Sequence, residues 1–138
     1  MKRLGLGLIS LLILIGLSGC NGKPIDNLKA NLSEYKECMV NNDFECQVEF
    51  MDLSSIEEIT GEKVNKDALI NQLKSSGIKV KSVQMNTPTK IISSGDTLSS
   101  TVSYSILMDM QGQELKQNAS INAISKDDGN TWLFNQSL

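Results

Sequence analysis

Hydrophobic residues in the first half of the chain recur every three to four positions, which is the spacing of one face of an α-helix. The clearest stripe consists of Leu28, Leu32, Tyr35 and Met39. It predicts a first helix that follows Pro24, has Asp26 or Asn27 as its N-cap and ends at the polar residues 41–43.

Two further helices are predicted before Gly77. Phe44, Val48 and Met51 repeat the helical period after Asp43, which is a suitable N-cap for a second helix. A short turn is expected at residues 55–61, ending at a glycine. A third helix begins with Asn65 as its N-cap, and Leu69 and Leu73 are expected to face the core from it.

After Gly77 the hydrophobic period changes to two, which is typical of β-strands. The alternation starts at Ile78 and Val80, and a slip in its parity predicts a β-bulge near Ser82. A short strand is expected at residues 89–93. Three later strands share one apolar face, formed by Leu98, Val102, Tyr104, Ile106, Met108, Met110, Leu115, Ala119, Ile121, Ala123, Trp132 and Phe134.

About three helices followed by about four antiparallel strands indicate one α+β domain, with the helices packed on one face of the sheet. The opposite face of the two longest strands carries small polar side chains. These are Ser99, Thr101, Ser103 and Ser105 on one strand and Lys116, Asn118, Ser120 and Asn122 on the next. This outward face is either plain solvent-exposed surface or a flat contact surface for a second copy or another protein.

The first twenty residues have the pattern of an export signal. A positively charged start precedes an apolar run at residues 4–17, which is shorter than the roughly 20 residues that a membrane-spanning helix needs. The run ends in Leu-Ser-Gly-Cys at residues 17–20, which resembles the lipobox of bacterial lipoproteins. The resemblance implies removal of residues 1–19 and lipid attachment at Cys20. The alternative is an uncleaved anchor or an ordinary signal peptide.

A lipobox also implies a location. Two or three acyl chains hold a protein stably on a bilayer, so the chain is expected on a membrane of the bacterial cell envelope, in contact with lipid but not spanning it. Asn21, not Asp, follows the cysteine, and by resemblance to enterobacterial sorting this favours the outer over the inner membrane. We expect a lipidated tether at residues 20–26, with a reach of about 20 Å, and a domain at residues 27–138.

Composition narrows the possible chemistry. The chain has no histidine, which removes His-based general bases and most zinc sites, and only 4% of its residues are aromatic. No phosphate-binding loop or other cofactor motif is present, so neither a cofactor nor a metal is expected.

The charge of the mature chain is uneven. Without the two cations of the signal, 11 basic residues face 16 acidic ones, so nucleic-acid binding is not expected. Residues 27–76 hold ten acids and five lysines, whereas residues 77–138 hold five of each. The acidic half is either a solvated helix surface or a face that meets a basic partner, such as a toxin or hydrolase that the protein inhibits.

Two cysteines remain once Cys20 is acylated. In a continuous helix, Cys38 and Cys46 would lie ~12 Å apart, but a turn at residues 41–43 can bring them within about 6 Å. Disulfides persist in exported proteins, and such a bond would contribute roughly 2.5 kcal/mol. The sequence favours this disulfide over two buried free thiols or a metal or redox pair, for which CxxC spacing is missing.

The order of elements resembles the nuclear transport factor 2-like fold, a cone-shaped, cystatin-like α+β domain. The resemblance rests on Asn-Asp-Phe-Glu at residues 42–45 and on Asp-Gly-Asn-Thr-Trp-Leu-Phe at residues 128–134, and it covers residues 27–136. It implies a curved sheet wrapped round the helices, often a pocket between them, and frequently a dimer through the outer sheet face. Catalytic members usually place His, Asp and Tyr in that pocket, so the lack of histidine removes the main catalytic residue here.

Other candidates for chemistry are few. Asp109 is expected to be a solvated strand-end carboxylate, because Tyr104 has the opposite parity and faces the other side of the sheet. Glu57 and Glu58 are expected at an exposed helix edge. Met39, Met51, Met85, Met108 and Met110 either fill the core or line an adaptable apolar pocket.

Together these observations predict a non-enzymatic binding or interaction domain, for a protein partner or an apolar small molecule. The alternative is a small enzyme of the same fold that uses carboxylates and tyrosine. An interior filled by Met108, Trp132 and Phe134 would count against a pocket, whereas an open cavity lined by two or more acids would favour the enzyme.

Overall fold

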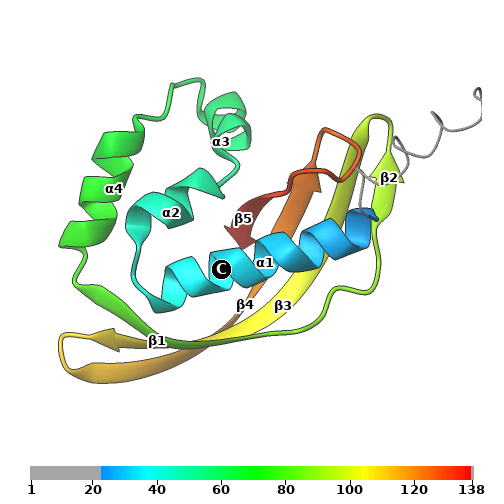
Figure 1. The fold of residues 1–138 in the computed structure, drawn as a ribbon. Coiled ribbons are helices and arrows are strands. Elements are labelled where there is room, and N and C mark those ends of the chain that lie inside the picture. The colour runs from blue at the N-terminus through cyan, green and yellow to red at the C-terminus, as the bar shows by residue number, and fades with distance from the viewer. Residues whose placement is uncertain (1–22, 138) are drawn as a thin grey trace, which may run out of the picture.

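The computed structural model describes residues 23–137, so the predicted signal peptide and Cys20 lie outside the described residues. Helices precede strands, as predicted (Figure 1). The helices are α1 (Pro24–Val40), α2 (Phe44–Glu49), α3 (Leu53–Thr60) and α4 (Lys66–Ser75). The strands are β1 (Ile78–Met85), β2 (Ile92–Ser94), β3 (Thr97–Met110), β4 (Gln113–Ser125) and β5 (Leu133–Ser137). The predicted α+β class is confirmed, with α3 in place of the expected turn and with a strand for each of the five segments named above.

The sheet is antiparallel, with the order β1-β3-β4-β5 and with β2 paired to the start of β3. Its centre is the long hairpin of β3 and β4, whose register runs from Leu98 opposite Ser125 to Met110 opposite Gln113. The predicted bulge is confirmed, because the register of β1 against β3 shifts between Val80 and Ser82.

The core lies between α1 and one face of the sheet, which α1 crosses (Figure 1). Its buried members are Leu28, Leu32, Tyr35, Met39, Val83, Val102, Tyr104, Ile106, Ile121, Ala123, Trp132 and Phe134. The hydrophobic stripe of the first helix and the parity of the long hairpin therefore predicted most of the core, and the expected burial of Met110 and Leu115 is wrong. Met110 and Leu115, near the hairpin end, are exposed because the sheet extends beyond the helix there.

The start of α1 differs from the prediction. The N-cap is Lys23 and the first helical residue is Pro24, so the last three residues of the predicted tether belong to the helix. Proline suits this position, because the first turn of a helix does not use its backbone N–H groups.

The same helix end is fixed to the turn between β4 and β5. Gly129 has a φ of +82°, and a Cβ at this position would lie 2.4 Å from the Cβ of Pro24. Asn27 Nδ2 donates to the Gly129 carbonyl at 2.9 Å, and the Trp132 N–H donates to Asn31 Oδ1 at 3.1 Å. Only glycine fits this close approach.

The predicted disulfide between Cys38 and Cys46 is present and joins α1 to α2, with 5.6 Å between the two Cα atoms. The chain reverses at Asn42, which has a φ of +54°. Asn42 also connects this turn to the sheet, since its Oδ1 accepts the N–H of Val80 at 2.8 Å and its Nδ2 donates to the Val80 carbonyl at 3.2 Å.

Helix α4 packs against α2, not against the core. Leu69 and Leu73 were expected to face the core, and this prediction is wrong, because both are only half-buried and neither belongs to the core cluster. Their spacing identifies the apolar face of α4, but not the element that this face meets. No helix within residues 23–137 is long and apolar enough to cross a membrane.

Candidate functional site on the outer sheet face

The space between α1 and the sheet is filled by side chains. Trp132 and Phe134 are each 1% exposed, and Met108 packs against the same cluster. The ring centroid of Tyr35 lies 5.1 Å from that of Phe134 and 5.8 Å from that of Phe50. These contacts fill the place where the resemblance implied a pocket.

Tyr35 contributes a hydroxyl to this interior. Gln136 Nε2 donates to the Tyr35 hydroxyl oxygen at 2.7 Å. Burial raises the pKa of Tyr35 to about 12, so the phenol is neutral at physiological pH. Its position is that of a core residue with a satisfied polar end.

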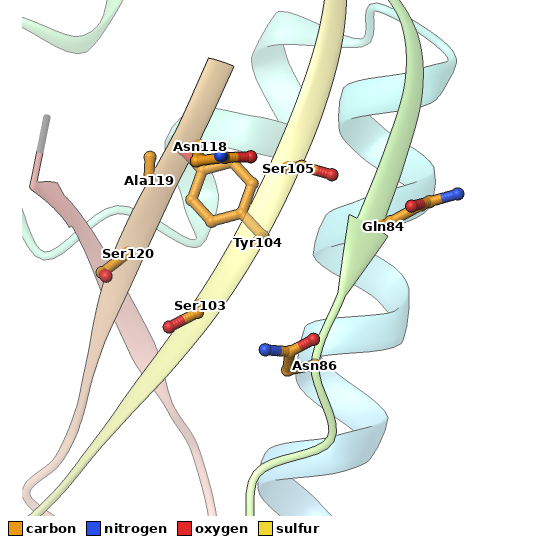
Figure 2. A pocket seen from close by; sticks show the side chains of 8 residues that line it. All are labelled: Gln84, Asn86, Ser103, Tyr104, Ser105, Asn118, Ala119 and Ser120. Carbon is orange, nitrogen blue, oxygen red and sulfur yellow. The ribbon is translucent and has the colours of Figure 1, made fainter. Parts of the chain in front are cut away.

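The outer face of the sheet, in contrast, carries an open hollow of about 480 Å³ over β1, β3 and β4 (Figure 2). The register places Thr101 opposite Asn122, Ser103 opposite Ser120, and Ser105 opposite Asn118. The predicted polar face is thus confirmed in its centre. The other two members of the predicted set, Ser99 and Lys116, lie opposite Ile124 and Leu107.

Six of the eight residues that line this hollow are Ser, Asn or Gln (Figure 2). The lining residues are Gln84, Asn86, Ser103, Tyr104, Ser105, Asn118, Ala119 and Ser120. Of these described residues, none carries a charge at neutral pH, because Tyr104 is the one that titrates and burial raises its pKa further above the ordinary value near 10. Such a surface can donate and accept hydrogen bonds, but it lacks a carboxylate for acid–base chemistry.

The hollow lies between two different ends of the outer face. At one end the register aligns Ile92, Ser99, Ile124 and Leu133, and Ile92 is 54% exposed. At the other end it aligns Lys79, Asp109 and Glu114. The outer face therefore has an apolar end, a neutral polar middle and a charged end.

The candidate acids lie apart from the hollow. Asp109 Oδ1 accepts the N–H of Gly112 at 2.8 Å in the β3–β4 turn, whereas Tyr104 belongs to the core cluster, so the structure does not bring the two together. Glu58 is exposed, as predicted, but Glu57 is half-buried. Glu57 Oε1 accepts the N–H of Val64 at 2.9 Å, which explains its position.

One buried acid was not predicted. Asp52 is 1% exposed and is the N-cap of α3. Its carboxylate accepts hydrogen bonds from the Ser54 hydroxyl at 2.7 Å and from the hydroxyl and N–H of Ser55. Burial favours the neutral acid, but these hydrogen bonds and the charge of Lys126 outweigh it and lower the pKa of Asp52. The Asp-x-Ser-Ser pattern is the signal that could have identified this cap.

Comparisons with known proteins bear on the fold. No family model matches the chain, and no curated protein is significantly similar to it. An NTF2-like protein from Cytophaga hutchinsonii has a similar structure, with a TM-score of 0.53 and 21% identity over 79% of this chain and 90% of that one. Bd1075 from Bdellovibrio bacteriovorus has a TM-score of 0.49 and 18% identity over 81% of this chain and 40% of that one. Together with the element order, the first likeness shows that the described chain has the nuclear transport factor 2-like fold.

Proposed function

We propose that this protein is a lipoprotein of the bacterial envelope, anchored through Cys20, and that its domain binds a protein partner through the outer sheet face without catalysing a reaction. One observation carries the proposed mode of binding: the interior is filled, while a hollow of about 480 Å³ opens on the outer face. The lipobox at residues 17–20 supports the anchor.

The layout of the outer face supports a protein partner over an apolar small molecule. Protein interfaces combine apolar contacts with hydrogen bonds at a polar rim. Here the exposed Ile92 and Leu133 lie at one end of a neutral surface rich in amides and hydroxyls. A second copy of the chain would be one such partner, in line with the dimers that the fold resemblance implies.

The anchor is tested by labelling cells that express the protein with an alkyne fatty acid. We expect label on the wild-type protein and none on a Cys20→Ser variant, and mass spectrometry should find Cys20 as the acylated first residue. An unlabelled protein that retains residues 1–19 would contradict the proposal.

Membrane fractionation of the wild type and of an Asn21→Asp variant tests the proposed preference for the outer membrane. We expect the wild type in the outer membrane and the Asn21→Asp variant in the inner membrane.

The partner surface is tested by photo-crosslinking in intact cells. A photoreactive phenylalanine analogue is placed at Ser103 or Asn118 in the hollow, and at Ser76 after α4 as a control. We expect one discrete crosslinked species from the two hollow positions and none from Ser76, and its mass distinguishes a dimer from a different partner. Equal crosslinking at all three positions, or none at the hollow, would overturn this assignment.

A further inference from the structure

A second groove lies between α1 and the chain that leaves β1. One flank of α1 contributes Lys29, Ser33 and Lys36, which are spaced four and three residues apart and so lie on the same side of the helix. The facing wall is formed by residues 85–88. The groove has a volume of about 280 Å³.

The charges in this groove differ from those of the surrounding half of the chain. Its titratable lining residues are Lys29 and Lys36, and neither takes part in a salt bridge among the described residues. Two acids of the same helix, Glu34 and Glu37, line a different hollow beside the Cys38–Cys46 disulfide. The predicted acidic surface is therefore divided along α1, and the groove is positively charged.

The rest of the lining suggests what kind of anion fits. Leu32, Met85 and Pro88 give the groove apolar walls, and all three are buried or half-buried. Hydrogen-bonding groups come from Ser33, Asn86 and Thr87. Ammonium groups beside apolar walls suit an amphipathic anion, with a phosphate or carboxylate next to alkyl carbons.

We propose that this groove binds the head region of an anionic phospholipid of the bilayer to which the protein is anchored. The inference rests on the proposed lipid attachment at Cys20. Three residues separate Cys20 from Pro24, a span of at most ~14 Å. Lys29 and Lys36 follow within about 8 and 18 Å along the helix axis. Both lysines therefore reach the headgroups when α1 lies along the bilayer surface.

The test uses the mature chain, residues 20–138, with Cys20→Ser so that binding is measured without an anchor. Amide chemical shifts are followed during titration with dihexanoyl phosphatidylglycerol or dihexanoyl phosphatidylcholine, both kept below their micelle concentrations. We expect saturable shifts at residues 29–36 and 85–88 with the anionic lipid alone. A Lys29→Gln/Lys36→Gln variant should bind about 25-fold more weakly, which is roughly five-fold for each lysine near an anionic headgroup.

A Lys63→Gln/Lys116→Gln variant is the matched control, because it loses the same charge at two exposed positions outside the groove. It should bind like the wild type. Equal shifts with both lipids, equal loss in the control variant, or equally tight binding of inorganic phosphate would each overturn the proposal. Failure of acylation at Cys20 would remove the bilayer as the source of the lipid but would leave the measured lipid affinity unchanged, so the two proposals can fail separately.

Discussion

The molecule consists of two regions that are held together in different ways. The α1–sheet unit, residues 24–40 and 78–137, contains every member of the main core cluster. The α2–α4 group, residues 44–75, packs beside it, and neither α3 nor α4, both fully described, contains a buried hydrophobic residue. Two exposed salt bridges, Lys66–Glu49 and Lys74–Glu45, link α4 to α2.

This difference shows where the free energy of unfolding comes from. Burial of large apolar side chains contributes about 1.5–3 kcal/mol for each residue, whereas an exposed ion pair contributes between 0 and 1 kcal/mol. The α1–sheet unit should therefore supply most of the stability. The α2–α4 group should depend on its connections to the α1–sheet unit, which include the disulfide and the backbone hydrogen bonds of Phe134 with Phe50 and Asp52.

The largest effect is expected in the filled interior. Phe134→Ala removes a ring that is 1% exposed and contacts Tyr35 and Phe50, so it should lower the free energy of unfolding by about 3–5 kcal/mol. Leu73→Ala in α4, where the side chain is half-buried, should cost about 1 kcal/mol. Urea unfolding followed by circular dichroism measures both. Similar losses in the two variants would remove the distinction between the regions.

The disulfide is a covalent link between the two regions in addition to the backbone. Cys38→Ser/Cys46→Ser should lower the free energy of unfolding by about 2.5 kcal/mol, because opening a loop of nine residues restores entropy to the unfolded chain. In this variant, hydrogen exchange should become faster in α2 than in the wild type, while exchange in β3 and β4 should change less. If hydrogen exchange became faster by the same factor in α2 and in the sheet, the disulfide would stabilise the whole domain and not the attachment of α2 in particular.

Tyr35 gives the interior a dependence on alkaline pH. Its folded pKa of about 12 lies above the value near 10 of an unfolded tyrosine, so its contribution is complete below pH 10 and is lost as the pH rises toward 12. Between pH 8 and pH 11 the ionisation of Tyr35 alone should account for a loss of about 1.4 kcal/mol in the free energy of unfolding. Tyr35→Phe should lack this component. An unchanged slope between pH 9 and 11 in the variant would contradict the burial of the phenol.

Much of the α1–sheet unit follows from sequence, because its patterns are local. The buried side of α1 is indicated by the stripe from Leu28 to Met39, and that of β3 by the alternation in residues 98–110. The slip in parity near Ser82 corresponds to the observed bulge. The Cys38–Cys46 bond was predictable because a turn between two helices is a local feature.

What the sequence did not predict depends on contacts between distant segments. Asn42 binds the backbone of Val80, 38 residues away, and no periodicity indicates such a pair. The groove on α1 exists because residues 85–88 pass beside Lys29 and Lys36. The outer hollow was foreseen only as a row of small polar residues, since its depth depends on how β1 pairs with β3.

The smallest effect is expected at the salt bridges of the α2–α4 group. Their side chains are at least 52% exposed, so Lys66→Gln/Lys74→Gln should lower the free energy of unfolding by at most about 1 kcal/mol, and less at high salt. Lys63→Gln, which removes an exposed lysine that forms no salt bridge within residues 23–137, is the control and should be neutral. A loss above 2 kcal/mol in the double variant would mean that charge, not the packing of α4 against α2, positions α4. A loss of at most about 1 kcal/mol in the free energy of unfolding would mean that charged residues on the exposed surface of this group can be substituted without unfolding the domain. Variation at Glu45 and Glu49 could then alter the acidic surface while the α1–sheet unit keeps both the outer hollow and the lysine groove in place.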